Sequence, residues 1–388
     1  MLSANLNELQ DPSSSAYKKA KRLHQKTTKN RPEHVDADWT PFRAAEKKFK
    51  ARFPPPDLSE VFDIAARDPS RAHEIRQGGW SGRSDAIPHE LHKPVDGSAH
   101  PIYTFPQIPG LVLLPSFLSS DEQRGLIRWS LRDHARHPNE TNLDIHYIVP
   151  EEGPWNLSRR STQEGSDPVE DIQPRASTCT ASPAQAEPSG PRQLIANEPA
   201  DKSNYLNLAS EPKLPAAPST TLKSASPEAL LPKLRWANIG WFYHWGTKHY
   251  DFSRGKIPVS DVYKDVCKRA VSSVPWSEVF GDDWREDEWG EDDWTTWNDS
   301  YEPDAGIVNF YQTKDTLMAH VDRSEVCATS PLVSVSLGCA AIFLIGGLTR
   351  DTEPIPILLR SGDVVIISGP QCRRAYHGKS VYELAMTF

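Results

Sequence analysis

The last hundred residues consist of short apolar runs separated by turn residues. The runs cover residues 308–311, 332–337, 340–345, 355–359 and 364–367. A glycine pair at 346–347 and a Ser-Gly-Asp sequence at 361–363 stand between them, and both favour tight turns. Short strands at regular spacing are typical of a β-barrel or jelly roll. The pattern therefore predicts a β-rich C-terminal region.

Strand and helix patterns alternate upstream. Residues 110–115 predict a short buried strand, and Ser119 with Glu122 then gives the capping-box signature of a helix whose apolar stripe contains Leu126, Ile127 and Leu131. Residues 235–250 are dense in aromatic side chains and predict a strand or lid, whereas 260–274 carry apolar residues at helical spacing. We therefore expect a mainly β protein with flanking helices, of the α+β class.

Three stretches lack a pattern that would bury a core. Residues 1–90 are polar without a sustained period, and residues 158–232 contain 33 Pro, Ser or Ala among 75. Such segments bury too little surface to offset the entropy of ordering them. Residues 282–297 form an acidic, Trp-rich loop. We expect a largely disordered N-terminal tail, followed by one domain over 91–388 that is interrupted by a disordered insertion and by this loop.

Two charge runs each allow more than one interpretation. Seven basic residues and no acid stand between Lys18 and Arg31, which is compatible with a nuclear address, a nucleic-acid arm, a matrix-targeting segment or a solvated tail. Residues 282–293 hold eight acids and one Arg among Trp residues. This run is either a solvated loop or a docking motif for a basic partner.

Composition narrows the class of protein. The chain has 388 residues, and its 34 Pro and mean hydropathy of −0.58 are too polar for one packed core throughout. No apolar run reaches the eighteen residues that a membrane span needs. The five Cys include no C-x-x-C pair, which favours reduced thiols inside the cell. A net charge of −8 argues against a generally basic nucleic-acid coat but allows a local basic groove.

The sequence His320-Val321-Asp322 is the first candidate for chemistry. On a strand, side chains two residues apart point to the same face, so an imidazole and a carboxylate would project together. His377 follows the strand-rich block and offers a third ligand. Two His and one carboxylate that leave open positions opposite are the arrangement of non-haem Fe(II) oxygenases. The spacing therefore favours iron.

Beyond this motif, a longer ordered series resembles a known family. The series consists of Asn309-x-Tyr311, His320-x-Asp322, residues 343–347, Ser361-Gly362-Asp363, Arg373 and Tyr376-His377-Gly378. It resembles the AlkB-type Fe(II)/2-oxoglutarate dioxygenases. The residues after His320 and the Arg235-Trp236 pair are most similar to the eukaryotic AlkB homologue 1 group.

The resemblance implies a double-stranded β-helix, or jelly roll, that holds Fe(II) through His320, Asp322 and His377. It implies that Asn309 and Tyr311 hydrogen-bond the co-substrate 2-oxoglutarate and that O₂ takes the remaining position. The expected reaction is the oxidative demethylation of N-methylated nucleobases in DNA or RNA, including tRNA, with DNA repair or tRNA modification as the role. A dioxygenase that acts on protein is an alternative.

A methylated base inside a duplex cannot reach a buried iron, so we expect a single-stranded or flipped substrate. Trp236 and Tyr243 are candidates to stack on it, although clustered aromatic residues more often pack in a core. Arg323 and Glu325 follow the metal ligands and could contact a phosphate and a base edge. We further expect a monomer in the nucleus or mitochondrion, or else in the cytoplasm.

The chain departs from the family downstream of His377, where the resemblance leads us to expect an Arg paired with 2-oxoglutarate. Lys379 is the only cation after His377. Gly378-Lys379-Ser380 can be encoded by GGT-AAG-TNN, which contains a splice-donor sequence. One interpretation is a truncation after residue 378, with the tail being translated intron. The other is a catalytically impaired AlkB-fold interaction protein.

Overall fold

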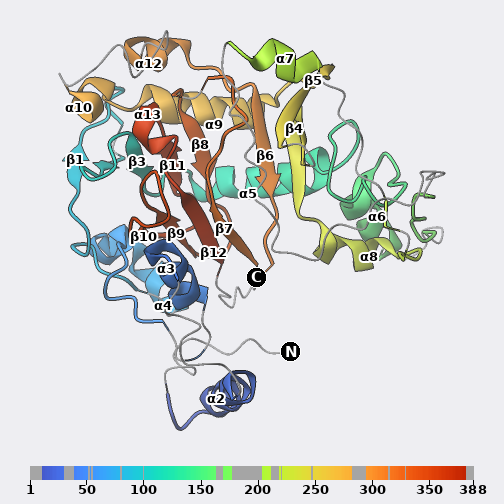
Figure 1. Ribbon diagram of the computed structural model, residues 1–388, viewed down its shortest axis with the longest axis horizontal. Coiled ribbons are helices and arrows are strands. Elements are labelled where there is room, and N and C mark those ends of the chain that lie inside the picture. The colour runs from blue at the N-terminus through green and yellow to red at the C-terminus, as the bar shows by residue number, and fades with distance from the viewer. Residues whose placement is uncertain are drawn as a thin grey trace.

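The computed structural model shows antiparallel β-sheets flanked by helices (Figure 1). It describes residues 11–29, 39–50, 53, 56–78, 81–98, 100–162, 169–176, 203–210, 218–219, 221–245, 248–281, 294–312, 315–327 and 329–381. Two of the sheets pack face to face and enclose one core, which confirms the prediction of a jelly-roll type of β-structure with flanking helices.

The strands form three sheets. The first contains, in spatial order, β1 (Glu90–His92), β2 (Ile102–Thr104), β3 (Leu111–Leu114), β11 (Val364–Ile367) and β8 (Leu332–Val335). The second contains β10 (Ile355–Leu359), β9 (Ala341–Ile345), β12 (His377–Val381) and β7 (Thr316–His320). The third contains β5 (His249–Lys256), β4 (Trp236–His244) and β6 (Ala305–Asn309). The apolar runs of the C-terminal region coincide with β6 and β8 to β11, so the strand prediction is confirmed.

The central strands bury both of their faces. In β11, Val365 and Ile367 face the second sheet, whereas Val364 and Ile366 face the helices on the other side. This double burial explains why such strands are continuous apolar runs instead of alternating patterns. Each fully buried aliphatic side chain contributes about 1.5–3 kcal/mol. The sheet is therefore held from both sides.

Helices cover the outer face of the five-stranded sheet. They are α5 (Ser120–Arg128), α9 (Asp261–Ser272), α10 (Trp276–Phe280) and α12 (Trp297–Ser300), and α5 and α9 lie across the strands in Figure 1. The capping box at the start of α5 is confirmed, because the Ser119 hydroxyl accepts from the Glu122 N–H and the Glu122 carboxylate accepts from the Ser119 N–H. A short π-helical turn, Trp129–His134, follows α5.

The three-stranded sheet lies beside this sandwich, together with α6 (Gly153–Ser161), α7 (Tyr205–Ser210) and α8 (Pro227–Leu230) (Figure 1). Its β4–β5 hairpin and the following α9 match the predicted strand or lid followed by a helix. Leu157, Leu230 and Leu234 bury their side chains against Ala237 of β4. These contacts fix the third sheet from the side opposite to the sandwich.

The prediction that residues 1–90 form a polar, disordered tail is wrong for residues 39–50 and 56–78. Helix α3 (Pro41–Lys50) buries Phe42 and Phe49 against the four-stranded sheet. The Phe62 N–H donates to the Pro356 carbonyl at 2.9 Å, and the Leu358 N–H donates to the Phe62 carbonyl at 2.8 Å. Phe62 thus pairs with the outer edge of β10. The described residues of this segment are therefore part of the folded domain.

Two buried ion pairs strengthen this attachment. Arg360 forms two hydrogen bonds to the Asp63 carboxylate, and Arg71 Nη2 lies 3.0 Å from Asp363. All four side chains are at most 6% exposed. Helix α4 (Ala72–Gly78) follows Arg71, whereas the basic helix α2 (Ser15–Thr28) buries none of its residues. Helix α2 therefore has the exposed, polar character that was predicted for the N-terminal tail, whereas α3 does not.

The two expected interruptions are only partly described. In the Pro-, Ser- and Ala-rich insertion, Ile172 is buried and pairs with Ala225, so the ends of the insertion are more ordered than predicted. In the acidic stretch, residues 282–293 lie outside the described residues, and Trp297 is a core residue of α12 and not part of a loop. Among the helices that the structure describes, none is both long and apolar enough to cross a membrane.

Candidate metal centre

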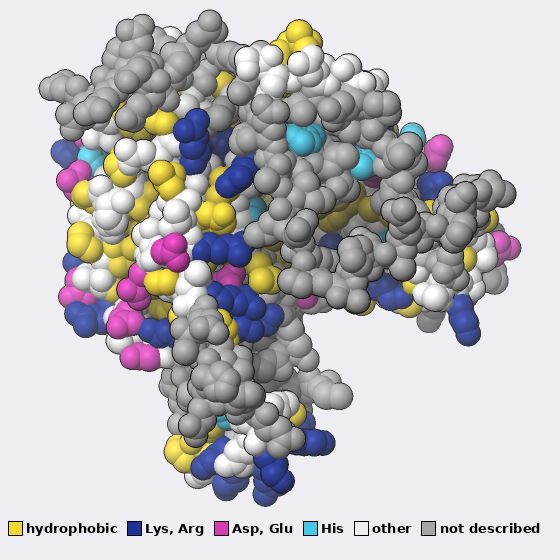
Figure 2. Space-filling model, in the orientation of Figure 1, with side chains coloured by type: hydrophobic (Ala, Val, Ile, Leu, Met, Phe, Trp, Pro, Cys, Tyr) yellow, Lys and Arg dark blue, Asp and Glu magenta, His cyan; other side chains and the backbone are white. Residues whose placement is uncertain are grey.

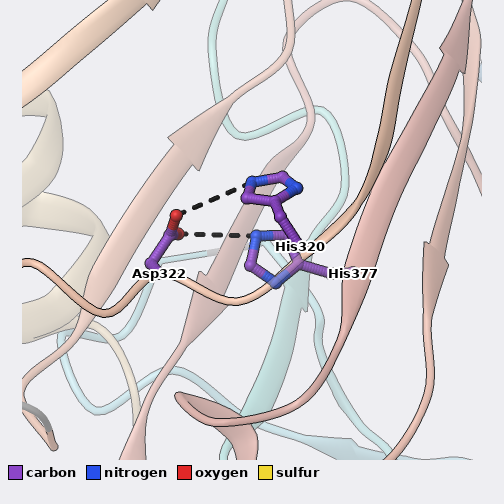
Figure 3. A group of neighbouring side chains, drawn as sticks. All are labelled: His320, Asp322 and His377. Atoms are coloured by element: carbon purple, nitrogen blue, oxygen red, sulfur yellow. Dashed lines mark ion pairs between the residues drawn. The ribbon is translucent and has the colours of Figure 1, made fainter. Parts of the chain in front are cut away.

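The three predicted metal ligands meet at one end of the four-stranded sheet (Figure 3). His320 ends β7 and His377 begins β12, and the two residues stand opposite each other in the strand register. Asp322 follows two residues after the end of β7. Candidate ligand atoms of the three side chains all lie within 4.8 Å of one another. Residues far apart in the sequence thus converge because β7 and β12 are neighbours.

Each imidazole is oriented by the backbone carbonyl two residues before it. His320 Nδ1 lies 2.9 Å from the Met318 carbonyl oxygen, and His377 Nδ1 lies 3.2 Å from the Ala375 carbonyl oxygen. A carbonyl only accepts hydrogen bonds, so each Nδ1 carries a proton and donates. The Nε2 atoms are then left to face Asp322, at 3.6 Å from His320 and 3.4 Å from His377. This is how metal-binding His residues are usually held.

The charges of the triad set its protonation. Burial lowers the pKa of His320, and the neighbouring His377 lowers it further. Burial also opposes protonation of His377, but the hydrogen bond and charge of Asp322 outweigh it and raise the pKa of His377. The same contacts overcome the effect of burial on Asp322 and hold the pKa of that carboxyl well below its usual range. A divalent cation bound here would displace the proton on His377.

The donor set fits Fe(II). The cluster offers two imidazole nitrogens and one carboxylate oxygen, three ligands that would leave further positions of a bound ion open for exchangeable ligands. A structural zinc site would instead close four positions with Cys or His, and no Cys belongs to this cluster among the described residues. The triad therefore matches the non-haem iron type that the sequence predicts.

The triad opens into a cavity of about 1690 Å³. Asn309 and Tyr311, the predicted contacts of 2-oxoglutarate, both line this cavity. Lys379 lies on β12, two residues after His377, and its Nζ stands 5.5 Å from the centre of the Tyr311 ring. Burial lowers the pKa of Lys379 to about 8. The cavity wall thus offers an amide, a phenol and an amine near the metal ligands.

The predicted substrate residues divide into two groups. Tyr243, Arg323 and Glu325 line the cavity. Trp236 is not among the residues that line it, and its ring stacks on Trp245 with the ring centres 5.3 Å apart. Trp245 lines the cavity and is 40% exposed, so it presents the ring that Trp236 supports. Sequence reasoning located the aromatic cluster but did not single out Trp245.

Glu325 takes part in a contact that the sequence did not predict. The Arg373 side chain is 4% exposed, and its Nη2 lies 3.5 Å from the Glu325 carboxylate. Its Nε has no hydrogen-bond partner among the described residues. Burial raises the pKa of Glu325, while Arg373 opposes that rise. Glu325 therefore already pairs with a buried cation, while its predicted contact with a base edge and that of Arg323 with a phosphate stay predictions.

Comparisons with known proteins agree with this geometry. A family model described as the 2OG-Fe(II) oxygenase superfamily matches residues 198–382. The DNA N(6)-methyladenine demethylase ALKBH1A of Arabidopsis thaliana is 29% identical over 357 residues, which cover 88% of this chain and 84% of that protein. The tRNA demethylase abh1 of Schizosaccharomyces pombe is 26% identical, with 87% and 83% covered.

A human relative matches a shorter region. The nucleic acid dioxygenase ALKBH1 of Homo sapiens is 36% identical over 143 residues, which cover 37% of this chain and 31% of that protein. The region that the family model matches contains β7 and β12, and with them the three predicted metal ligands. The chain belongs to the AlkB-like Fe(II)/2-oxoglutarate-dependent dioxygenases.

Proposed function

We propose that this enzyme oxidatively demethylates N-methylated nucleobases in single-stranded or flipped nucleic acid. The observation that carries the proposal is the His320, Asp322 and His377 triad at the wall of a large cavity that is also lined by aromatic side chains. These three residues would hold Fe(II). The bound iron, with 2-oxoglutarate and O₂, supplies the oxidising power that hydroxylates an N-methyl carbon, after which formaldehyde leaves and the base is restored.

The protein would bind the co-substrate through electrostatic attraction and orient it through hydrogen bonds. Two neutral imidazoles and one carboxylate leave a divalent ion with one net positive charge, which attracts the dianion 2-oxoglutarate. Asn309 and Tyr311 line the same cavity, and we expect them to donate hydrogen bonds to 2-oxoglutarate. Lys379 adds a cation beside Tyr311. The proposed metal ligands and the proposed co-substrate contacts thus line one cavity.

The aromatic residues of the β4–β5 hairpin are suited to grip an unstacked base. Tyr243 contacts Trp245 edge to face with the ring centres 4.9 Å apart, and Tyr243 contacts Tyr250 at 5.4 Å. Stacking on such rings contributes about 1–3 kcal/mol per base and tolerates different bases. The apolar rings also exclude water from the reacting carbon. Arg323 lines the cavity next to Asp322, and we expect it to contact a phosphate.

The relatives support a nucleic acid as the substrate. Three of them are named as demethylases, of DNA N(6)-methyladenine, of tRNA and of N6-methyladenosine in RNA. Methylated adenine in DNA and RNA strands is therefore the first substrate class to test.

The test is succinate and formaldehyde formation by the full chain with Fe(II), 2-oxoglutarate and single-stranded DNA or RNA oligonucleotides that carry N-methyladenine. The controls are the unmethylated strands and His320→Ala. We expect both products in equal amounts from the methylated strands. Neither product should form from the unmethylated strands or with His320→Ala. Succinate without formaldehyde from any strand would contradict a nucleic-acid substrate, and turnover with a protein in its place would favour the protein-directed alternative.

We also propose that α2 directs the chain to the nucleus or the mitochondrion. Figure 2 shows Lys and Arg side chains gathered on this helix at the lower end of the molecule. Imaging of the chain with and without residues 1–38, fused to a fluorescent protein, tests this proposal. A monomer remains our prediction, and so does a basic partner for the acidic stretch.

A further inference from the structure

Among the strands that the structure describes, the one that carries His320 has a neighbour on one side only. In its sheet, β7 is the last strand and pairs with β12. An edge strand presents unpaired backbone groups and is held less firmly than a central one. His320 is especially sensitive to this, because its Nδ1 donates to Met318 of the same strand and its ring therefore follows the path of the backbone.

Two side chains satisfy the free edge of β7 one residue before His320. The Ala319 N–H donates to Glu46 Oε1 at 2.6 Å, and the Ala319 carbonyl accepts from Arg350 Nη2 at 2.8 Å. In an antiparallel strand, the N–H and C=O of one residue point to the same side. Glu46 and Arg350 thus make the pair of hydrogen bonds that a neighbouring strand would make.

The two side chains are connected to each other and to His377. The N–H of Phe42, at the start of α3, donates to the Arg350 carbonyl at 3.1 Å, so α3 and Arg350 are held together. The Arg350 guanidinium lies 5.2 Å from the centre of the Tyr376 ring, next to His377 in the chain. The Glu46 side chain is only 12% exposed and also pairs with Arg43 at 2.8 Å.

We propose that Glu46 and Arg350 are positioning residues of the metal centre, which hold β7 so that His320 meets Asp322 and His377. The proposal rests on the metal site of the proposed function. Helix α3, outside the region that the family model matches, thereby becomes part of the site. Partners that orient metal ligands in this indirect way typically change metal affinity by about 10–100-fold when they are lost.

The test is a titration of the full chain with Co²⁺, followed by its visible absorption, for the wild type and four variants. We expect Glu46→Ala to weaken Co²⁺ binding about tenfold and to alter the spectrum. Glu46→Gln keeps an oxygen that accepts from Ala319 and should retain most of the affinity. Glu60→Gln, which removes the ion pair with Lys48 on the same segment, is the matched control and should leave binding unchanged. His320→Ala should abolish specific binding.

Three results would overturn the proposal. Co²⁺ affinity of Glu46→Ala within twofold of the wild type, with only a lower melting temperature, would mean that Glu46 is purely structural. Equal damage by Glu46→Gln and Glu46→Ala would exclude the hydrogen bond as the cause. A wild type that binds Co²⁺ no better than His320→Ala would overturn the metal site itself. Should Glu46→Ala not fold, Arg350→Gln decides, with about tenfold weaker binding expected and unchanged binding contradicting the proposal.

Discussion

Arg373 and Glu325 form an ion pair inside the wall of the metal-site cavity, with 3.5 Å between Nη2 and the carboxylate. Arg373 also lowers the pKa of Asp322. The Arg373 side chain is 4% exposed and that of Glu325 is 28% exposed, so removing Arg373 leaves a partly buried carboxylate without its cation. We expect Arg373→Met to lower the free energy of unfolding by about 1–3 kcal/mol, as measured by urea denaturation at pH 7.

A double variant provides the control for this prediction. Arg373→Met combined with Glu325→Leu removes both charges, so it should recover most of the stability that Arg373→Met loses. Losses that simply add in the double variant would show that the two side chains do not interact.

Gly378 is required where β12 passes β7. A Cβ at this position would lie 2.8 Å from the Leu317 carbonyl oxygen and 3.2 Å from the Ala319 nitrogen, both of them backbone atoms. Gly378→Ala therefore pushes the two strands apart beside His320 and His377. We expect about tenfold weaker Co²⁺ binding in the same titration. Gly125→Ala in α5 is the control, because nothing lies within 4 Å of its added Cβ. It should bind Co²⁺ as the wild type does and be slightly more stable.

Asp63 joins the N-terminal segment to the turn before β11. Its carboxylate accepts from Arg360 and from the Ala65 and Gly82 N–H groups, and the residue is fully buried. We expect Asp63→Ala to cost about 3–5 kcal/mol in urea denaturation. Asp85→Ala breaks an ion pair with Arg83 in which both side chains are more than half exposed. It should leave the free energy of unfolding almost unchanged, and similar losses for the two variants would contradict a structural role of the buried pair.

His134 makes stability depend on pH. The residue is 5% exposed, and burial lowers the pKa of its imidazole from 6.5 to about 4. Between these values the unfolded chain binds a proton that the folded chain does not, so stability falls as the pH drops from 6.5 to 4. The loss at the lower end is on the order of 3 kcal/mol. His134→Phe should remove this part of the pH dependence, measured as the difference in unfolding free energy between pH 7 and pH 4.5. An unchanged difference would contradict the assignment.

The sequence predicts the sandwich and the metal ligands better than the rest. Strands such as β9 and β11 are buried on both faces, so their apolar runs are visible without structural context. The triad could be predicted because His320, Asp322 and His377 belong to an ordered series of motifs that resembles one family, and in that family these positions bind iron. By contrast, Phe42 and Phe49 are isolated apolar residues among charged ones, and their partners on β9 and β10 lie far downstream. No local pattern marks such contacts.

The aromatic residues of the β4–β5 hairpin show a second limit of prediction from the sequence. Trp236 and Tyr243 were predicted together as substrate contacts, but only Tyr243 lines the cavity. On β4, the cavity is lined by Ile239, Trp241 and Tyr243, which alternate along the strand and share one face. Trp236 stands seven residues before Tyr243, and in a strand this odd spacing puts the two side chains on opposite faces. The density of aromatic residues alone therefore does not indicate which of them reach the cavity.

The N-terminal segment covers both edges of the four-stranded sheet, with Glu46 at β7 and the backbone of Phe62 at β10. A fragment that starts at residue 91 would keep every metal ligand but leave both edges bare. Bare edges are templates on which other chains add strands. Such a fragment is expected to aggregate at concentrations where the full chain stays in solution. Its loss of activity would then result from aggregation and not from the loss of a metal ligand.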